Sequence, residues 1–175
     1  MNYEELEALL EYHYWACDRM LDALEALAPE QWARPVESSF KSIRDTAVHI
    51  WAAELVWCSR WQGRSPSGLQ SSEAFPTARS LRLAWQDLER DVRSVLRDLG
   101  LQGIKRRFEY KSLAGQPQSS VFWHMLQHAV NHATYHRGQL TTMLRQVEAN
   151  PPKSMDLITF YREREANLKT AGQTS

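Results

Sequence analysis

The sequence predicts an all-α fold, a four-helix bundle with a short extra helix near the C-terminal end. Apolar residues recur at three- and four-residue steps in four long segments, as they do along one face of an amphipathic helix. Alternating, strand-like patterns are few, and a chain of 175 residues suits one domain better than two. The connecting segments are long for a simple up-and-down bundle and leave room for an overhand crossing.

The ends of the first two helices are marked by specific residues. The first helix is expected over residues 2–28 and stops before Pro29, which cannot continue it. The second is expected over residues 42–62. Ser42 opens it, and Asp45 follows three residues later in the pattern of a capping box.

The second half of the chain contains one interruption. A third helix is expected over residues 77–100, from a threonine cap to a glycine. Residues 101–117 follow no helical period, so we expect an irregular or short extended excursion there. Ser119 or Ser120 then caps a fourth helix, which continues to about Val147.

A last, short helix is expected over residues 156–166, after prolines that break the fourth one. The bundle domain is therefore expected to span residues 1–167. Residues 168–175 are expected to form a disordered tail, because terminal polar segments without a packing face are rarely ordered.

The charge balance argues against whole classes of partner. The chain has 21 basic and 21 acidic residues, which removes any sequence-wide attraction to nucleic acid or to an anionic membrane surface. No segment approaches the ~20 apolar residues of a membrane span, and the acidic N-terminal segment does not resemble a signal peptide. The two cysteines do not suggest a disulfide framework. We therefore expect a cytoplasmic protein that binds neither nucleic acid nor membrane.

Three histidines are predicted to point to the same place from two helices. His132 and His136 lie four residues apart, about 40° apart on a helical wheel, on the arc that carries apolar residues. His49 lies on the apolar side of the second helix. Neutral imidazole is the commonest metal ligand, and three protein ligands with one open position are usual for catalytic zinc. The alternative is that the three rings are hydrogen-bonded core residues.

The identity of the ion is left open, because imidazoles suit Zn²⁺, Ni²⁺, Fe²⁺ and Co²⁺. Four nearby residues are candidates for the pocket. His128 borders the histidine arc and could support a ligand, while Tyr135 and Gln139 could line the pocket. Asp45 lies one turn before His49; it could accept a proton from a ligand imidazole, although capping the helix is the favoured interpretation. Arg137 points away from the arc, where a structural ion pair is expected.

Longer stretches of the sequence are informative about its family. The segments SFKSIRDTAVHIWAAELVWCSRWQG, HAVNHATYHRGQL and PPKSMDLITFYRE resemble the DinB family, also called DinB/YfiT-like, and the likeness covers nearly the whole chain. The resemblance implies a four-helix bundle of up-down-down-up type that is often dimeric. It also implies one divalent metal ion bound by a histidine of the second helix and two of the fourth, which here are His49, His132 and His136.

The first helix departs from the family pattern. The family often reads like YNxWAN there, whereas this chain reads YHYWAC, with His13 and Cys17 in place of the asparagines. Both lie on the core face of the helix. Either they simply pack in the core, or they reach the pocket, His13 as a substrate contact or extra ligand and Cys17 as a thiol.

These features favour a metal-dependent enzyme acting on a small molecule. A divalent ion lowers the pKa of a bound water or thiol, which supports either hydrolysis or thiol transfer. Thiol-dependent S-transferases and an isomerase in the wider superfamily favour transfer from a low-molecular-weight thiol. No Ser-His-Asp set or conspicuous carboxylate base is present, so the species bound to the metal would carry the chemistry. The alternative is a non-catalytic metal-binding protein of the stress response.

Two tryptophans bear on association. Trp15 and Trp51 fall on the outward sides of their helices, where tryptophan often marks a contact surface. With the family's tendency, this favours a homodimer. The alternative is that both pack against the long loops.

Overall fold

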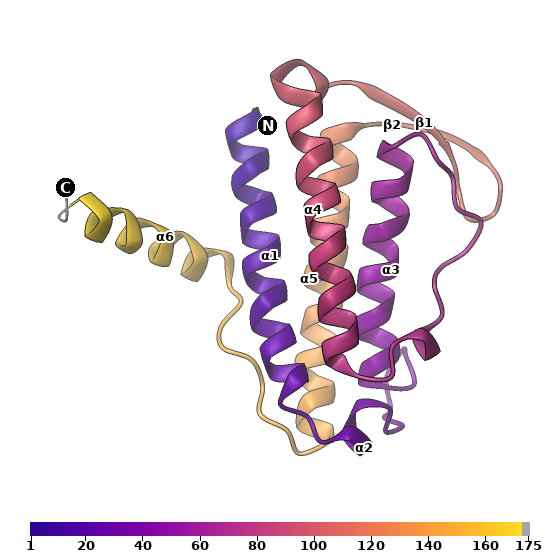
Figure 1. The fold of residues 1–175 in the computed structure, drawn as a ribbon, viewed down its shortest axis with the longest axis vertical. Coiled ribbons are helices and arrows are strands. Elements are labelled where there is room, and N and C mark those ends of the chain that lie inside the picture. The colour runs from indigo at the N-terminus through magenta and orange to yellow at the C-terminus, as the bar shows by residue number, and fades with distance from the viewer. Residues whose placement is uncertain (173–175) are drawn as a thin grey trace.

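Four long helices lie side by side in the computed structural model, which describes residues 1–172 (Figure 1). They are α1 (Tyr3–Glu25), α3 (Ile43–Trp61), α4 (Ala78–Gly103) and α5 (Phe122–Gln146). α3 and α4 run in the same direction, antiparallel to α1 and α5, so the topology is up-down-down-up as expected (Figure 1). The crossing from α3 to α4 runs back along the length of the bundle and contains a short 3-10 turn, η1 (Ser72–Ala74).

Side-chain caps fix the starts of three helices. Asn2 and Glu5 form a reciprocal capping box at α1, and Thr77 and Ser80 form one at α4. The backbone amide of Asp45 donates to the Ser42 hydroxyl at 3.1 Å, which caps α3. A one-turn helix, α2 (Pro29–Trp32), lies in the connection before it.

The start of the fourth helix was predicted wrongly. Ser119 and Ser120 belong to a strand, β2 (Pro117–Val121), which pairs antiparallel with β1 (Arg107–Lys111). α5 begins only at Phe122, and the free amides of Phe122 and Trp123 donate to backbone carbonyls just before β1. The hairpin therefore supplies the cap for which a serine was expected.

The helical backbone of α4 is broken at Gly100, the residue at which this helix was expected to end. Its φ of 56° interrupts the helix, and the chain then makes a further turn to Gly103. β1 follows, and its side chains alternate between more buried and more exposed positions, as in a strand. The segment 101–117, expected to be irregular or extended, is therefore a helical turn followed by a β-hairpin.

α6 (Leu157–Gly172) leaves the bundle and extends away from its side (Figure 1). It is attached through Phe160, whose ring lies 5.9 Å from Tyr12 and 5.6 Å from Trp15, and through an ion pair between Glu163 and Arg19 at 2.7 Å. The helix continues through residues 168–172, which were expected to belong to a disordered tail; residues 173–175 lie outside the described part.

The two outward tryptophans pack within the chain. Trp15 lies against α6, and Trp51 is buried with its ring 4.8 Å from Phe75, in the connection between α3 and α4. They are therefore not an exposed contact surface. In the described residues, no helix has both the length and the apolar character needed to cross a membrane.

Candidate metal centre

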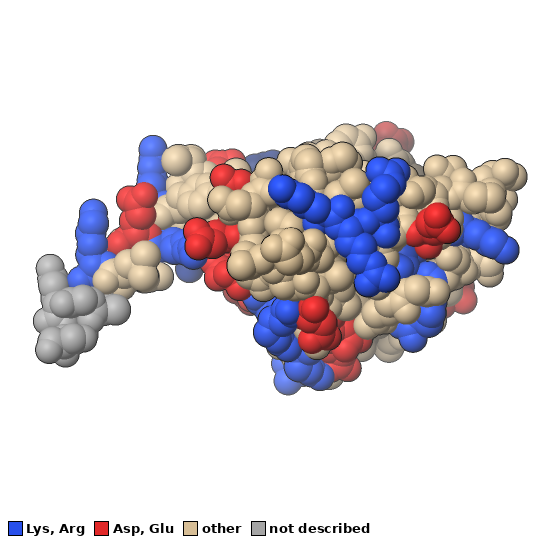
Figure 2. All heavy atoms as spheres, turned by 90° about the horizontal axis from the view of Figure 1, so that it is seen from above, with Lys and Arg blue, Asp and Glu red and all other residues tan. Residues whose placement is uncertain are grey.

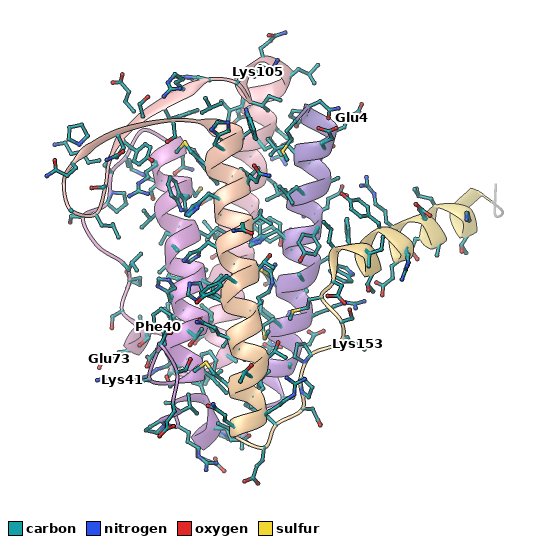
Figure 3. The ribbon with its side chains drawn as sticks, turned by 180° about the vertical axis from the view of Figure 1, so that it is seen from behind. Glu4, Phe40, Lys41, Glu73, Lys105 and Lys153 are labelled. Atoms are coloured by element: carbon teal, nitrogen blue, oxygen red, sulfur yellow. The ribbon has the colours of Figure 1, made fainter. Side chains whose placement is uncertain are left out.

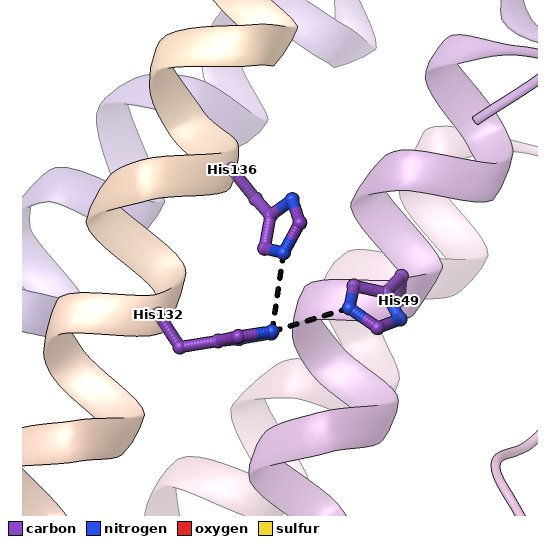
Figure 4. A group of neighbouring side chains, drawn as sticks. All are labelled: His49, His132 and His136. Carbon is purple, nitrogen blue, oxygen red and sulfur yellow. Dashed lines mark hydrogen bonds between the residues drawn. The ribbon is translucent and has the colours of Figure 1, made fainter. Parts of the chain in front are cut away.

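The three predicted histidines meet between α3 and α5, the two helices that pack most extensively in the bundle. The Nε2 atom of His132 lies 3.2 Å from that of His49 and 3.1 Å from that of His136 (Figure 4). One ligand nitrogen from each ring falls within 4.8 Å of the other two. The four-residue step along α5 stacks two of the rings, and α3 presents the third across the seam.

The spacing of these nitrogens fits a shared ion. Two nitrogens bound at about 2.1 Å to a tetrahedral ion lie roughly 3.4 Å apart. The observed separations of 3.2 and 3.1 Å are close to this value. Among the residues that the structure describes, the group contains no carboxylate or thiol, so a bound ion would keep a position open for another ligand.

The electrostatics favour the neutral form of two of these rings, His132 and His49. Burial, together with neighbouring His136, His49 and His128, lowers the pKa of His132 to about 4. Burial and His136 also lower the pKa of His49. Because only a neutral imidazole offers a lone pair to a metal, the lowered pKa values favour ligation by His132 and His49.

Gln139 orients one of the ligands. Its Oε1 atom lies 2.7 Å from Nδ1 of His136, one turn along α5. An amide oxygen accepts, so Nδ1 of His136 carries the proton and the lone pair of Nε2 faces the cluster. Gln139 was expected to line the pocket; the structure gives it this supporting contact with a ligand.

Two aromatic residues surround the cluster. The ring of Phe40 lies 4.6 Å from that of His49 and 5.5 Å from that of His136. Figure 3 shows Phe40 beside α3 and α5. Tyr135 is 65% exposed and its ring lies 5.0 Å from His136, at the edge of the site. Phe40 was missed because it lies in a connection without periodic signal, where a single aromatic residue does not reveal its position.

Asp45 and His128 lie near the cluster without supporting its ligands through a described hydrogen bond. The Asp45 carboxylate accepts a hydrogen bond from Ser72 at 2.6 Å and so ties η1 to the start of α3. The His128 ring packs 5.2 Å from that of Trp57 and 6.0 Å from that of His132.

His13 and Cys17 lie in a different, buried polar network. Nε2 of His13 is 3.0 Å from Oε2 of Glu54 and 3.7 Å from Sγ of Cys17. Glu54 also accepts hydrogen bonds from Tyr14 at 2.7 Å and from Trp85 at 2.9 Å. One carboxylate therefore connects α1, α3 and α4, and the two residues are not in the three-histidine group.

The ionisation of this network is strongly perturbed. Burial lowers the pKa of His13, but Cys17 and Glu54 outweigh it and raise that pKa to about 10. Burial raises the pKa of Glu54, but His13, Tyr14 and Trp85 outweigh it and hold that pKa below its usual value. Sequence reasoning missed Glu54; an isolated acid on an otherwise apolar helix face was the signal that could have found it.

Arg137 is also buried beside this network. Its guanidinium donates to Thr134 at 2.8 Å and to Cys17 at 3.5 Å, and lies 5.8 Å from the centre of the Tyr12 ring. An ion pair was expected for Arg137, but none of the ion pairs among the described residues includes it.

Comparison with known proteins agrees with this architecture. The model of the DinB family matches residues 1–166. The chain belongs to the DinB family. Protein DinB of Bacillus subtilis (strain 168) is 28% identical over 171 residues, which cover 90% of this chain and 95% of that protein.

A solved structure supports the same fold for this DinB-family chain. The crystal structure of a DinB-like protein from Bacillus cereus ATCC 10987 matches with a TM-score of 0.58. The match covers 83% of this chain and 95% of the other at 20% identity, a level that speaks for the fold alone. Family membership and the three-histidine cluster are together compatible with metal binding.

Proposed function

We propose that this DinB-family protein is a metal-dependent S-transferase. One divalent ion, Zn²⁺, Ni²⁺ or Fe²⁺, is held by His49, His132 and His136, and a low-molecular-weight thiol is transferred to a small-molecule substrate. The observation that carries the proposal is the convergence of three imidazoles without a fourth protein ligand in the described group. A purely structural site would be closed by the protein itself.

The chain's own residues have separate roles in this proposal. The three histidines hold the ion, and Gln139 fixes the ring of His136. Phe40 covers the cluster and keeps water from one side of it. When bound, the ion lowers the pKa of a thiol and so favours the nucleophilic thiolate. The sulfur forms a bond to an electrophilic carbon, the leaving group departs with its electron pair, and the thiol proton passes to solvent.

Hydrolysis is the second candidate for the same site, because an open position accepts water as readily as a thiol. It is less well supported here. Activating water commonly needs a nearby base, and the described group offers no carboxylate for that role. A thiol, with an ordinary pKa near 8.5, needs much less assistance.

We further propose a cytoplasmic location and a homodimer. Both cysteines are buried and unpaired with each other, which suits a reducing compartment. Leu157, Ile158 and Leu168 leave apolar surface exposed on α6, which a second copy would cover. Sedimentation velocity at micromolar concentration tests the dimer, and a monomer would contradict it.

A direct test measures loss of free thiol in the presence of a chlorinated aromatic electrophile. The protein is stripped with a chelator and then reloaded separately with each of the three metals. We expect thiol consumption that depends on the metal in the wild type and is absent in His49→Ala. His124→Ala, which removes an exposed histidine of α5, is the matched control and should retain activity. Equal rates with and without metal would contradict the proposal.

A further inference from the structure

A second cavity lies on the side of α5 that faces α1, away from the histidine cluster. It has a volume of about 680 Å³ and is lined by α5, by Tyr12 of α1 and by the segment that connects α5 to α6, on which Figure 3 labels Lys153. This segment is tied to α1, because the Tyr12 hydroxyl donates to the carbonyl of Met155 at 3.1 Å and Arg19 donates to that of Ser154 at 2.6 Å. The lining residues include none of the three histidines.

The walls of this cavity carry an excess of positive charge. Three basic residues line it, Arg137, Arg145 and Lys153, against one acid, Asp156. None of the ion pairs among the described residues includes any of these three cations. The Asp156 carboxylate accepts a hydrogen bond from Ser154 at 3.1 Å. The excess of two positive charges would be matched by a ligand that carries two negative ones.

Arg137 is the cation that is removed furthest from water. Its side chain is only 2% exposed. Its guanidinium donates to the Thr134 hydroxyl at 2.8 Å and to the sulfur of Cys17 at 3.5 Å, and neither acceptor is a carboxylate. The carboxylate of the neighbouring network, Glu54, contacts His13 at 3.0 Å instead. Because a buried charge without a countercharge costs stability, an anion bound in the cavity would offset that cost.

Gly138 leaves space in the wall beside Arg137. It lies inside α5 and lines the same cavity, and a Cβ atom added to it would meet no atom within 4 Å. Glycine inside a helix lowers stability relative to alanine, and here no described side chain packs into the space that it leaves. This space therefore belongs to the cavity and is open to a ligand.

The other walls suit the organic part of a ligand. The apolar surfaces of Tyr12, Pro152, Met155 and Leu157 line the cavity, together with the hydroxyl groups of Thr141 and Ser154. The volume lies in the range of sites for small organic molecules and is far larger than one inorganic anion needs. The cavity therefore combines a charged part with an apolar part.

We propose that this cavity binds a small organic phosphate monoester, with Arg137 in contact with the phosphate and with Arg145 and Lys153 adding positive charge at the exposed rim. A guanidinium makes strong charge-assisted hydrogen bonds to phosphate oxygens. A monoester is mostly a dianion above pH ~6 and balances the two excess charges, whereas a carboxylate or a sulfate ester balances only one. The site is independent of the function proposed for the three histidines.

The test compares phenyl phosphate with phenyl sulfate, which are similar in size and differ in charge. Isothermal titration calorimetry at pH 8 measures the binding of each to the full chain. We expect wild type to bind the phosphate at least about tenfold more tightly than the sulfate, as for one additional charge-assisted hydrogen bond. No binding of phenyl phosphate at millimolar concentration, or equal affinity for both esters, would overturn the proposal.

Two variants locate the binding site. Arg137→Gln should weaken phenyl phosphate binding about 10- to 100-fold. Gly138→Leu keeps every charge and places a side chain in the cavity, so it should lose binding even if Arg137→Gln does not fold. Lys105→Gln removes an exposed lysine toward the opposite end of the bundle and should bind like wild type (Figure 3). Wild-type affinity in Gly138→Leu, with circular dichroism showing a folded protein, would overturn the proposal.

A further variant separates this cavity from the metal centre, because a phosphate could also bind an ion held by the histidines. His49→Ala removes one of the three imidazoles and leaves the lining of the cavity intact. We expect it to bind phenyl phosphate with wild-type affinity, whether or not the function proposed for the histidines is correct. Binding that is lost in His49→Ala would place the phosphate at the metal centre and overturn the proposal.

Discussion

At the scale of single residues, Gln139 is expected to set the metal affinity without touching the ion. Replacing it by leucine removes the acceptor that holds Nδ1 of His136, so the ring can turn and change tautomer. We expect Gln139→Leu to weaken metal binding about 10- to 100-fold. Competition against a chromophoric chelator measures this. Gln127→Leu, at an exposed position of the same helix, should bind like wild type, and equal affinity of both variants would contradict the role.

The pair of His13 and Glu54 predicts how stability depends on pH. The pKa of His13 is about 10 in the folded protein, against about 6.5 in the unfolded chain. Between these values the folded state holds one more proton, so this contribution is complete below pH ~6.5 and is lost as pH rises toward 10. We expect stability to fall by roughly 1 kcal/mol per pH unit across this window.

Urea unfolding at several pH values, with a chelator present, measures the slope. His13→Gln should show a much smaller slope than wild type, whereas His124→Gln should match wild type, because His124 is exposed. A slope in His13→Gln as steep as in wild type would contradict this assignment. Metal content should be unchanged in either variant, since neither residue belongs to the cluster.

Residue positions could be predicted only as far as a helical wheel allows. The wheel gives the direction of a side chain, and this was enough to bring His49 toward His132 and His136. It gives neither depth nor partner. The wheel therefore cannot decide whether His13 packs in the core or lines the pocket. Its partner Glu54 is 41 positions away in the sequence, and only the structure shows the two side by side. Phe40 lies outside any helix, so a helical wheel gives no direction for its side chain.

At the scale of elements, the attachment of α6 to the bundle is expected to depend mainly on the aromatic contacts of Phe160, because the Glu163–Arg19 ion pair is partly exposed. Phe160 is buried between Tyr12 and Trp15, while Ile158 on the same helix is 54% exposed. We expect Phe160→Ala to speed hydrogen exchange in α6 strongly and in α3 and α5 hardly at all, because local opening needs few contacts to be lost. Hydrogen-exchange mass spectrometry with Ile158→Ala as control tests this. Unchanged exchange in α6 would contradict it.

The helices could be predicted because each one shows its apolar face in sequence, and two of the expected caps, Ser42 and Thr77, are as predicted. The hairpin could not. β1 has only five residues. Its partner β2 contains Ser119 and Ser120, which in the sequence resemble the cap of a helix. Pairing between strands is a non-local interaction that no short window contains. Similarly, α6 continues past its expected end because packing does not determine where an exposed helix stops.

At the scale of the whole molecule, charge argues against nucleic acid as a partner. Figure 2 shows basic side chains gathered on the face seen from above, with acidic ones around them, and Lys105–Arg107 are three consecutive basic residues at this end. Because the total charge is zero, we expect no duplex binding at physiological salt. Fluorescence anisotropy with a labelled duplex tests this. Micromolar binding that weakens steeply with salt would show that the local cluster suffices.

The most direct test of the whole account is the metal content of protein purified without an affinity tag or chelator, for wild type and His49→Ala. The account predicts close to one equivalent of a divalent ion in wild type and very little in the variant, because two histidines of one helix would remain without the third ligand. Wild-type protein that takes up no ion, even after incubation with Zn²⁺, Ni²⁺ and Fe²⁺, would contradict it. The three imidazoles would then be packing residues of the seam between α3 and α5.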